Sequence, residues 1–321
     1  MKTILITGCA GFIGSNLIAK LIDNNKIIGI DNFISSNEGK LKDFISHENF
    51  KFMQSDIIDV LSIEEEIDII YNLACPASPP RYQNMPIFTL KTNFIGTLNL
   101  LELAREKSSI FIQASTSEIY GDPDPKHVPM AESYRGNVSC QGPRACYDES
   151  KRVGETLSYI YHTSYGTNTN TIRPFNVFGP GMQETDYRVL PNFASRIKGG
   201  APLNVYGSGN QTRTFCYITD AMVGFLLVVL KGVSGEAYNI GNPKPEISMI
   251  DLVKKIEVLS SKSVEYNIVE YPDSYPADEP NRRAPDIRKA KLQLDFNPQV
   301  DLDQGLKRFL DWANTVYRGE Q

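Results

Sequence analysis

The chain has 321 residues, of which 33 are Lys or Arg and 38 are Asp or Glu, so its net charge is −5 with neutral His. This length allows two domains, and 41% hydrophobic residues suffice for a sizeable core and argue against disorder. The acidic balance, without a run rich in Lys and Arg, speaks against binding to nucleic acid or to an anionic membrane surface.

The rarest residues restrict the chemistry further. His47, His127 and His162 are far apart in the sequence and have no His or Cys partner at ligand spacing, which predicts no metal site and no Ser-His-Asp hydrolase. The five Cys residues are scattered without a CxxC pair, which favours a reduced, cytoplasmic protein. We expect no signal peptide, and the longest apolar stretch, 221–230, falls well short of the ~20 residues that a membrane helix needs.

Strand-like and helix-like segments alternate through the first 180 residues. Apolar strands are expected at 3–7, 26–31, 50–56, 67–74, 108–115 and 168–174, and helices at 12–25, 86–107 and 146–166. Strands that are apolar on both faces and separated by helices indicate a parallel sheet covered by helices on both sides. We therefore predict an α/β fold with a doubly wound, Rossmann-type parallel sheet.

The character of the sequence changes after residue 180. Gly and Pro become frequent, strands become short, and isolated helices are expected at 189–199, 220–232, 248–261 and 301–319. This predicts a dinucleotide-binding domain over residues 1–180 and a smaller mixed α/β lobe over residues 181–321, with some crossing of the chain between them.

The first predicted strand leads into a glycine-rich turn, Gly8-x-x-Gly11-x-x-Gly14, which opens the first predicted helix. Such glycines let the backbone approach a pyrophosphate, which the helix N-terminus then holds. Asp31 ends the second strand, where a carboxylate binds the adenosine ribose and repels a 2′-phosphate. Since no Arg follows in residues 32–40, NAD is expected rather than NADP. Asp56 with Ile57, after the third strand, is a candidate neighbour of the adenine or a plain strand-end cap.

Tyr147 and Lys151 are four residues apart in a predicted helix, so both side chains project from one face. A nearby ammonium group lowers the pKa of a phenol towards neutrality, which makes Tyr147 a candidate acid/base for a substrate hydroxyl. The spacing alone is also typical of an ordinary surface pair. It gains weight from the segment ASTSEIYGD at 114–122, which ends the fifth strand at the edge of the sheet where ligands bind.

Together with RPFNVFGP at 173–180, these motifs resemble the extended short-chain dehydrogenase/reductase family, and within it the UDP-glucuronate decarboxylases, or UDP-xylose synthases. The resemblance covers almost the whole chain, through LACPASPPRYQNMP, LKTNFIGTLNLLELA, STSEIYGDP, GPRACYDESKR, VYGSGNQTRTF and RRAPDIRKAKLQL. It implies NAD as cofactor, a UDP-linked nucleotide sugar as substrate, and a homodimer packed through the helices at 86–107 and 146–166. It also implies oxidation of the sugar at C4, loss of the carboxylate from the 4-ketone, and internal recycling of NAD.

The resemblance implies roles for individual residues as well. Thr116 would bind the sugar hydroxyl, with Tyr147 as the base and Lys151 as its electrostatic partner. Glu118 and Arg213 would orient the sugar carboxylate and manage the C5 proton. The implied cofactor-binding residues are Gly8, Gly11, Phe12, Ile13, Gly14, Asp31, Asn32, Ser35, Asp56, Ile57, Leu73, Ala74, Thr92, Tyr147, Lys151 and Arg188. The implied substrate-binding residues are Lys91, Ser117, Asn176, Tyr206, Arg213 and Arg283.

Two segments depart from the family pattern. The first has Arg135 where the family usually has Trp, and Ser139-Cys140-Gln141 in place of Asn-Pro-Ile. The second is the loop R-M-H-x-x-D-G-R, which reads GMQETDYR at 181–188 and keeps Arg188. We expect both near the sugar and the nicotinamide. A C4 dehydrogenase, epimerase or dehydratase for another nucleotide hexose or heptose, including a GDP-linked one, therefore stays open, as does a non-catalytic NAD-binding regulator.

Overall fold

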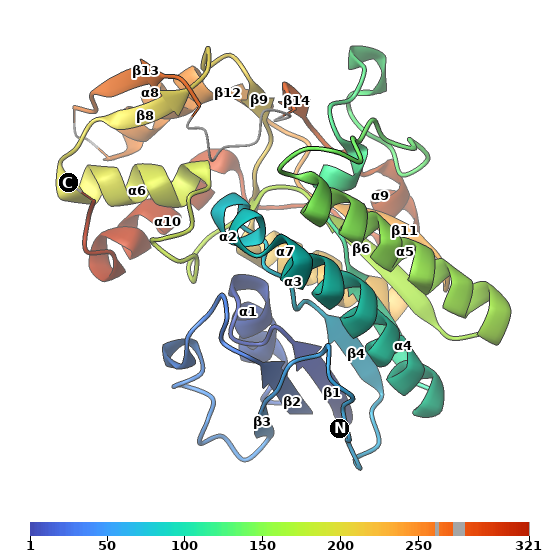
Figure 1. Cartoon of the computed structure of the whole chain (residues 1–321). Helices are drawn as coiled ribbons and strands as arrows, with labels where there is room; N and C mark the ends of the chain where they lie inside the picture. Colours follow the sequence, from blue (N-terminus) through green and yellow to red (C-terminus); the bar gives the residue numbers. More distant parts are fainter. Residues whose placement is uncertain (261–262, 272–279, 321) are drawn as a thin grey trace.

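A seven-stranded parallel sheet forms the centre of the computed structural model, which describes residues 1–260, 263–271 and 280–320 (Figure 1). Its strands are β1 (Lys2–Thr7), β2 (Asn25–Asp31), β3 (Phe50–Gln54), β4 (Ile69–Asn72), β5 (Ile110–Ala114), β6 (Thr169–Pro174) and β11 (Ala237–Ile240). Their lateral order is β11-β6-β5-β4-β1-β2-β3, and all neighbours pair in parallel. This confirms the predicted doubly wound α/β fold, whose strand order reverses between β1 and β4.

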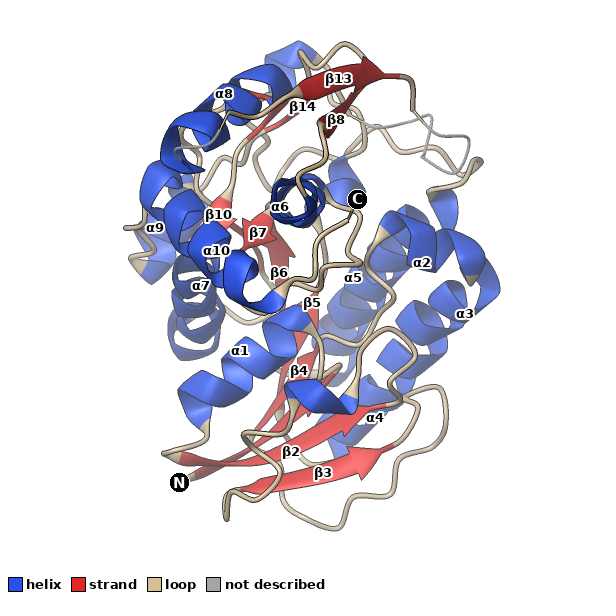
Figure 2. Cartoon of the chain, turned by 90° about the vertical axis from the view of Figure 1, so that its left-hand side faces the viewer, coloured by secondary structure: helices blue, strands red, loops and turns tan. Residues whose placement is uncertain are grey.

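Alternation along the strands divides the core between the two faces of the sheet. On β1, Ile4 and Ile6 pack into one hydrophobic cluster with α1 (Phe12–Leu21) and α7 (Ile218–Lys231), whereas Leu5 packs into the other. The opposite face is covered by α4 (Thr97–Glu106) and α5 (Ala145–Tyr165), as Figure 2 shows from the side. Burial on both faces explains the hydrophobic runs of β1 and β2, ILI at residues 4–6 and IIGI at residues 27–30.

The helix predicted over 86–107 consists of three joined pieces. These are α3 (Pro86–Lys91), a π-helical segment η2 (Thr92–Gly96) and α4. A Cβ at Gly96 would lie 2.5 Å from Ile57 Cδ1, so this close approach to the segment after β3 requires glycine. The wider π turn adjusts the helix where it passes the carboxyl edge of the sheet, and such turns are frequent near functional sites.

The seventh strand, β11, was not predicted. It follows α7 in the second half of the chain and extends the sheet beyond β6. The strand has four residues, and the buried Asn239 in its middle breaks the apolar pattern. Asn239 Nδ2 donates to the carbonyls of Met130 and Asp286, at 2.9 and 3.0 Å, so tertiary hydrogen bonds compensate its burial.

The remaining elements after residue 180 form a smaller lobe above the sheet (Figure 1). It contains small sheets in the orders β13-β8 and β12-β9-β14, while β7 pairs with β10. Its strands are β8 (Leu203–Tyr206), β9 (Thr212–Arg213), β12 (Ile247–Ser248), β13 (Tyr266–Val269) and β14 (Arg282–Arg283), with β7 (Val177–Phe178) and β10 (Cys216–Tyr217) below them. Its helices are α6 (Val189–Gly199), α8 (Met249–Ser260) and α10 (Leu302–Val316), whereas α9 (Arg288–Leu294) packs against β11 and α7 beside the central sheet. Among the described residues, no helix has the length and apolar character needed to cross a membrane.

Candidate active site

A cavity of about 360 Å³ lies at the carboxyl edge of the sheet, below the smaller lobe. Its floor comes from the segments that follow parallel strands, including Gly8 after β1, Leu73 after β4 and Thr116 after β5. Its other walls include Tyr206 and Arg213 of the lobe. A second, smaller cavity shares Gly8, Gly11, Ser35 and Leu73 with it. Ligands of doubly wound sheets bind at this edge, next to the point where the strand order reverses.

The structure brings almost all of the predicted site residues to these two cavities. The main cavity is lined by Gly8, Gly11, Phe12, Ile13, Gly14, Ser35, Leu73, Thr116, Ser117, Glu118, Tyr147, Lys151, Asn176, Arg188, Tyr206, Arg213 and Arg283. The smaller cavity adds Asp31, Asn32, Asp56, Ile57, Ala74 and Thr92. Lys91 differs, since it is exposed at the end of α3 and lines neither cavity.

The glycine-rich turn has the geometry of an anion cradle. Gly8 has φ +64°, and a Cβ at Gly14 would lie 2.4 Å from the Gly8 carbonyl oxygen, so neither position tolerates a side chain. No side chain caps α1, which starts at Phe12 and directs its first N–H groups towards the cavity that Phe12 and Ile13 line. Such a helix start attracts a pyrophosphate through its N–H groups and its dipole.

Asp31 anchors the backbone around the smaller cavity. Its Oδ2 accepts a hydrogen bond of 2.9 Å from Ala10 N in the glycine turn, and its Oδ1 accepts from Phe33 N and Ser36 Oγ at 2.9 and 2.8 Å. Asp56 Oδ2 in turn accepts from Asn32 Nδ2 at 2.9 Å. The two carboxylates thus sit where an adenosine would lie, and Asp31 couples the glycine turn to the loop after β2.

Tyr147 and Lys151 lie on the first two turns of α5 and are both buried. Lys151 Nζ lies 5.9 Å from the centre of the Tyr147 ring and donates to the Ala114 carbonyl at 2.8 Å. Burial raises the pKa of the Tyr147 hydroxyl, against a lowering contribution from its hydrogen bond with Thr116. The pKa of Tyr147 is therefore raised, whereas the spacing of Tyr147 and Lys151 leads us to expect a lowered pKa. The reason is that desolvation of the buried hydroxyl is the largest contribution to its pKa.

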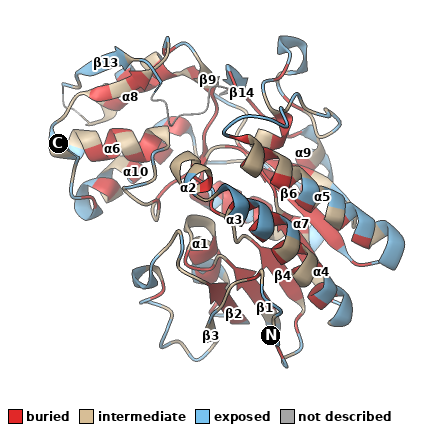
Figure 3. Cartoon of the chain, viewed as in Figure 1, coloured by how far each residue is buried: buried red, intermediate tan, exposed pale blue. Residues whose placement is uncertain are grey.

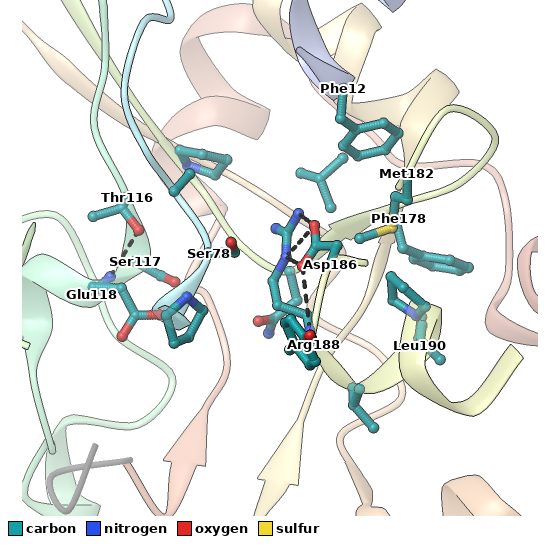
Figure 4. Close-up of a pocket in the computed structure, with 18 of the residues that line it drawn as sticks. Phe12, Ser78, Thr116, Ser117, Glu118, Phe178, Met182, Asp186, Arg188 and Leu190 are labelled. Carbon is teal, nitrogen blue, oxygen red and sulfur yellow. Dashed lines mark hydrogen bonds and ion pairs between the residues drawn. The ribbon is translucent and has the colours of Figure 1, made fainter. Parts of the chain in front are cut away.

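Thr116 begins a short 3₁₀ helix, η3 (Ser117–Tyr120), directly after β5. Its Oγ1 accepts from the Glu118 backbone N–H at 3.2 Å and thereby caps the helix, so Thr116, Ser117 and Glu118 form one wall of the cavity (Figure 4). Across from them, Figure 4 shows Arg188 paired with Asp186, and beyond this pair the apolar side chains of Phe178 and Met182. The Arg188 Nε lies 2.9 Å from Asp186 Oδ1.

Three buried charged residues gather beside Glu118. Its Oε2 forms ion pairs with Arg144 Nη2 and, at 2.7 Å, with Arg283 Nη2. Arg144 Nε also lies 3.3 Å from Asp148 Oδ2. Arg144, Arg283 and Asp148 are each less than 10% exposed, so together with Glu118 they form a compact, largely desolvated group of two guanidinium and two carboxyl groups at the edge of the cavity.

The two segments that depart from the family pattern have different positions. Arg135, Ser139, Cys140 and Gln141 are exposed and line neither cavity, contrary to expectation. Gln183, in contrast, lines the main cavity, where its Oε1 accepts from Arg81 Nη2 at 2.9 Å and its Nε2 donates to the Ser35 carbonyl at 3.3 Å. Only the second segment therefore changes the walls of the site.

The sequence of residues 4–241 matches the profile described as "NAD dependent epimerase/dehydratase family". The chain belongs to this family. The predicted family and the predicted cofactor, NAD, are thereby confirmed.

Several proteins similar to this chain are named as enzymes of UDP-glucuronic acid. The chain is 45% identical to UDP-glucuronic acid decarboxylase 1 of Xenopus tropicalis, over 97% of this chain and 72% of that protein. It is 44% identical to UDP-glucuronic acid decarboxylase 5 of Arabidopsis thaliana, over 94% and 86%. Among solved structures, the UDP-glucuronic acid 4-epimerase of Bacillus cereus, in complex with UDP-glucuronic acid and NAD, is similar with a TM-score of 0.86 and 30% identity, over 98% of this chain and all of that one.

The residues present in this family member fit NAD. The crowded glycine turn, the uncapped start of α1 and the carboxylates of Asp31 and Asp56 provide places for a pyrophosphate and an adenosine. The described residues contain no cluster of His, Cys, Asp and Glu that could hold a metal ion.

Sequence reasoning assigned no role to three residues of the site, Tyr82, Ser78 and Arg144, which all line the main cavity. Tyr82 stacks on Tyr147, with ring centres 4.9 Å apart and an angle of 11°. Tyr82 Oη and Ser78 Oγ are buried without a hydrogen-bond partner in the described part of the chain. Buried polar atoms of this kind call for a partner, which a ligand in the cavity can supply. Each of the three lies within a segment that carried the family resemblance, LACPASPPRYQNMP or GPRACYDESKR, which was the available signal.

Asp148 makes the stability of this protein depend on pH. Burial, followed by the charge of Glu118, raises the pKa of its carboxyl to about 7. Between about pH 4 and pH 7 the folded chain holds a proton that the unfolded chain has lost, so this group lowers the free energy of unfolding as the pH rises. Asp148→Asn is therefore expected to stabilise the fold by roughly 2–4 kcal/mol at pH 8 and by much less at pH 5.

Thermal unfolding of both proteins at pH 5 and pH 8 measures this effect. Asp43→Asn, at an exposed position, is the matched control and should shift neither curve. An Asp148→Asn variant that is equally or less stable than the wild type at pH 8 contradicts the prediction.

Proposed function

We propose that this protein converts UDP-glucuronate to UDP-xylose and carbon dioxide, with NAD recycled within the site. The observation that carries the proposal is the buried Arg213, which lines the same cavity as Tyr147, Thr116 and Glu118. A neutral hexose needs no buried guanidinium group beside its ring, whereas a sugar carboxylate is held well by one. The decarboxylase names of relatives at 45% and 44% identity support the same substrate.

In the first step, Tyr147 Oη accepts the proton of the sugar C4 hydroxyl, while Thr116 Oγ1 positions that hydroxyl. Both side chains are buried and line the same cavity, so they can act together on one substrate hydroxyl. Oxidation at C4 and its reversal are the chemistry that bound NAD supplies. Lys151, whose Nζ donates to the Ala114 carbonyl, places a positive charge beside the tyrosine and so favours the phenolate form that accepts this proton.

The second step follows from the position of the new ketone. A C4 ketone is β to the C6 carboxylate, so the C5–C6 electron pair passes to the ketone as an enolate when carbon dioxide leaves. Arg213 is proposed to hold the carboxylate before this step, and Glu118 to guide the proton that adds to C5. Tyr147 would then return its proton to the C4 oxygen as the ketone is reduced, which gives UDP-xylose.

The decisive test is incubation with UDP-glucuronate and separately with neutral UDP- and GDP-sugars, followed by mass spectrometry. The proposal expects a product lighter by one carbon dioxide from UDP-glucuronate alone. Conversion to an isomer of equal mass, detected by chromatography, would instead identify an epimerase. Loss of two hydrogens or of water from a neutral sugar nucleotide would identify a dehydrogenase or a dehydratase.

Arg213→Ala is expected to weaken the binding of UDP-glucuronate selectively. Arg213 is buried in β9, where its Nη1 donates to the Thr212 carbonyl at 2.8 Å. Loss of its charge-assisted contacts with the carboxylate should raise the KM for UDP-glucuronate roughly 10- to 100-fold. The dissociation constant of UDP-glucose, measured by calorimetry, should change much less.

The neighbouring Arg282→Ala serves as the control, because Arg282 is half-exposed and pairs with Glu246 on the surface. If Arg213→Ala weakened the binding of UDP-glucuronate and of UDP-glucose equally, Arg213 would not bind the sugar carboxylate. The result would instead indicate that Arg213 binds the diphosphate.

We propose further that residues 1–180 bind mainly NAD and that residues 181–321 bind mainly the nucleotide sugar. We also propose that each site residue other than Lys91 has the role that the family resemblance implies for it. The five Cys residues are free, which supports a location in the reducing cytoplasm. The residue roles are supported by the finding that these residues line the two cavities.

The chain is also proposed to form a homodimer through α3, η2 and α5. These elements lie side by side on the outer surface (Figure 3) and expose Ile87, Phe94 and Ile160 at 64, 47 and 42%. Leu101 and Tyr161, on the same two predicted helices, are buried in the core and are not available for an interface. Light scattering should give twice the chain mass for the wild type and a monomer for Phe94→Glu. A monomeric wild type at micromolar concentration would overturn this proposal.

A further inference from the structure

Arg144 occupies a central position in the charged group although no role follows for it from sequence. It immediately precedes α5 and is 5% exposed. Its Nη2 pairs with Glu118 Oε2 and its Nε with Asp148 Oδ2, so a single guanidinium connects η3 to the first turn of α5. A planar guanidinium can make two such directed contacts at once, which an ammonium cannot.

Both guanidinium partners of Glu118 approach the same oxygen. Arg144 Nη2 and Arg283 Nη2 both pair with Oε2, and they come from different parts of the fold, one from the residue before α5 and one from β14. Two donors on one oxygen fix the rotation of the carboxyl group about its last bond. The other oxygen, Oε1, is then the one presented to a bound sugar in the cavity that Glu118 lines.

The backbone of Arg144 also holds the start of the catalytic helix. Its carbonyl accepts from Tyr147 N at 2.9 Å and from Asp148 N at 3.0 Å. The same residue therefore sets the position of Tyr147 through its main chain and that of Glu118 through its side chain. A movement of Arg144 would change the distance between the group that takes the C4 proton and the group assigned to C5.

We propose that Arg144 is a positioning residue for decarboxylation: it fixes Glu118 at a set distance from Tyr147 and acts on the substrate only through Glu118. The inference rests on the proposed function. It predicts that removal of the Arg144 side chain has no effect once the Glu118 carboxylate is gone, because there is then nothing left for the guanidinium to position.

A double-mutant cycle on the NAD-loaded enzyme tests this prediction. Arg144→Gln should lower the turnover of UDP-glucuronate about 10²-fold, the cost of a misplacement near 1 Å, with KM changed less than threefold. The double variant Arg144→Gln/Glu118→Gln should be as active as Glu118→Gln alone, within about threefold, because residues that act as a unit are non-additive. Arg144→Lys should recover part of the turnover, since it keeps the charge near Glu118 but not the bridge to Asp148.

Several outcomes would overturn the inference. One is a turnover of the double variant that falls by the product of the two single-variant reductions. Another is an Arg144→Gln variant whose KM rises while its turnover does not fall. A third is an Arg144→Gln variant with the turnover of the wild type. Thermal unfolding checks that the variants fold, and Arg144→Lys replaces Arg144→Gln in the cycle if the latter does not. Arg105→Gln, an exposed arginine that pairs with Glu102 on α4, is the control and should leave turnover unchanged.

Failure of the proposed function is recognised separately. It appears in the wild type, which would then release no carbon dioxide from UDP-glucuronate. In that case the same cycle is measured on whichever nucleotide sugar the wild type converts, and non-additivity remains the prediction.

Discussion

Tyr147→Phe is expected to lower turnover roughly 10²- to 10⁴-fold, the usual contribution of a positioned acid/base group. Tyr147 is 7% exposed, stacks on Tyr82 and is hydrogen-bonded to Thr116, so only its hydroxyl is removed and the ring keeps its packing. The dissociation constant of UDP-glucuronate should change little, because the lost interaction operates in the transition state. Steady-state release of carbon dioxide together with calorimetric binding measures both quantities.

Tyr159→Phe is the matched control, since Tyr159 lies on the same helix with 62% of its surface exposed. Its turnover should equal that of the wild type. Tyr147→Phe with more than a tenth of wild-type turnover would show that another group takes the C4 proton.

Lys151→Met is expected to reduce turnover at least ~10²-fold and also to weaken NAD binding. The ammonium is buried, donates to the Ala114 carbonyl at 2.8 Å and lies 5.9 Å from the Tyr147 ring. Burial already raises the pKa of Tyr147, so without this charge the phenolate becomes still harder to form. Methionine keeps the length and the apolar stem of lysine, which limits the effect on packing.

The readouts are single-turnover release of carbon dioxide and the amount of NAD retained after gel filtration. Lys254→Met, at an exposed position on α8, controls for the substitution itself. If Lys151→Met keeps both its turnover and its NAD, the pairing of Tyr147 with Lys151 is not part of the mechanism.

The sequence predicted well those features that depend on residues close together in the chain. The glycine turn, the buried strands and the i, i+4 pair of Tyr147 and Lys151 all arise within short segments, where spacing determines geometry. Features that depend on distant contacts were missed. Glu118 and Arg283, which pair at 2.7 Å, are 165 residues apart in the chain, and no periodicity reports such a contact.

Two differences have a specific physical cause. β11 escaped prediction because Asn239 interrupts a strand of four residues, and its side chain is accommodated by hydrogen bonds with Met130, Asp286 and Tyr120, which are distant in the sequence. The direction of the Tyr147 pKa was wrong because the spacing of an ammonium and a phenol says nothing about desolvation, which here dominates. Burial has to be seen in three dimensions before such shifts can be assigned.

The position of β11 in the chain, far after its neighbour β6, has a consequence for the way this protein folds. Among the described strands, only β11 pairs with the edge of β6 that faces away from β5, so this edge stays open during synthesis from residue 174 until residue 240 has left the ribosome. An unpaired strand edge is a template for association with another chain. A nascent chain that stops between these two points would therefore present an adhesive sheet edge, and expression of residues 1–180 alone should yield aggregates rather than an isolated cofactor domain.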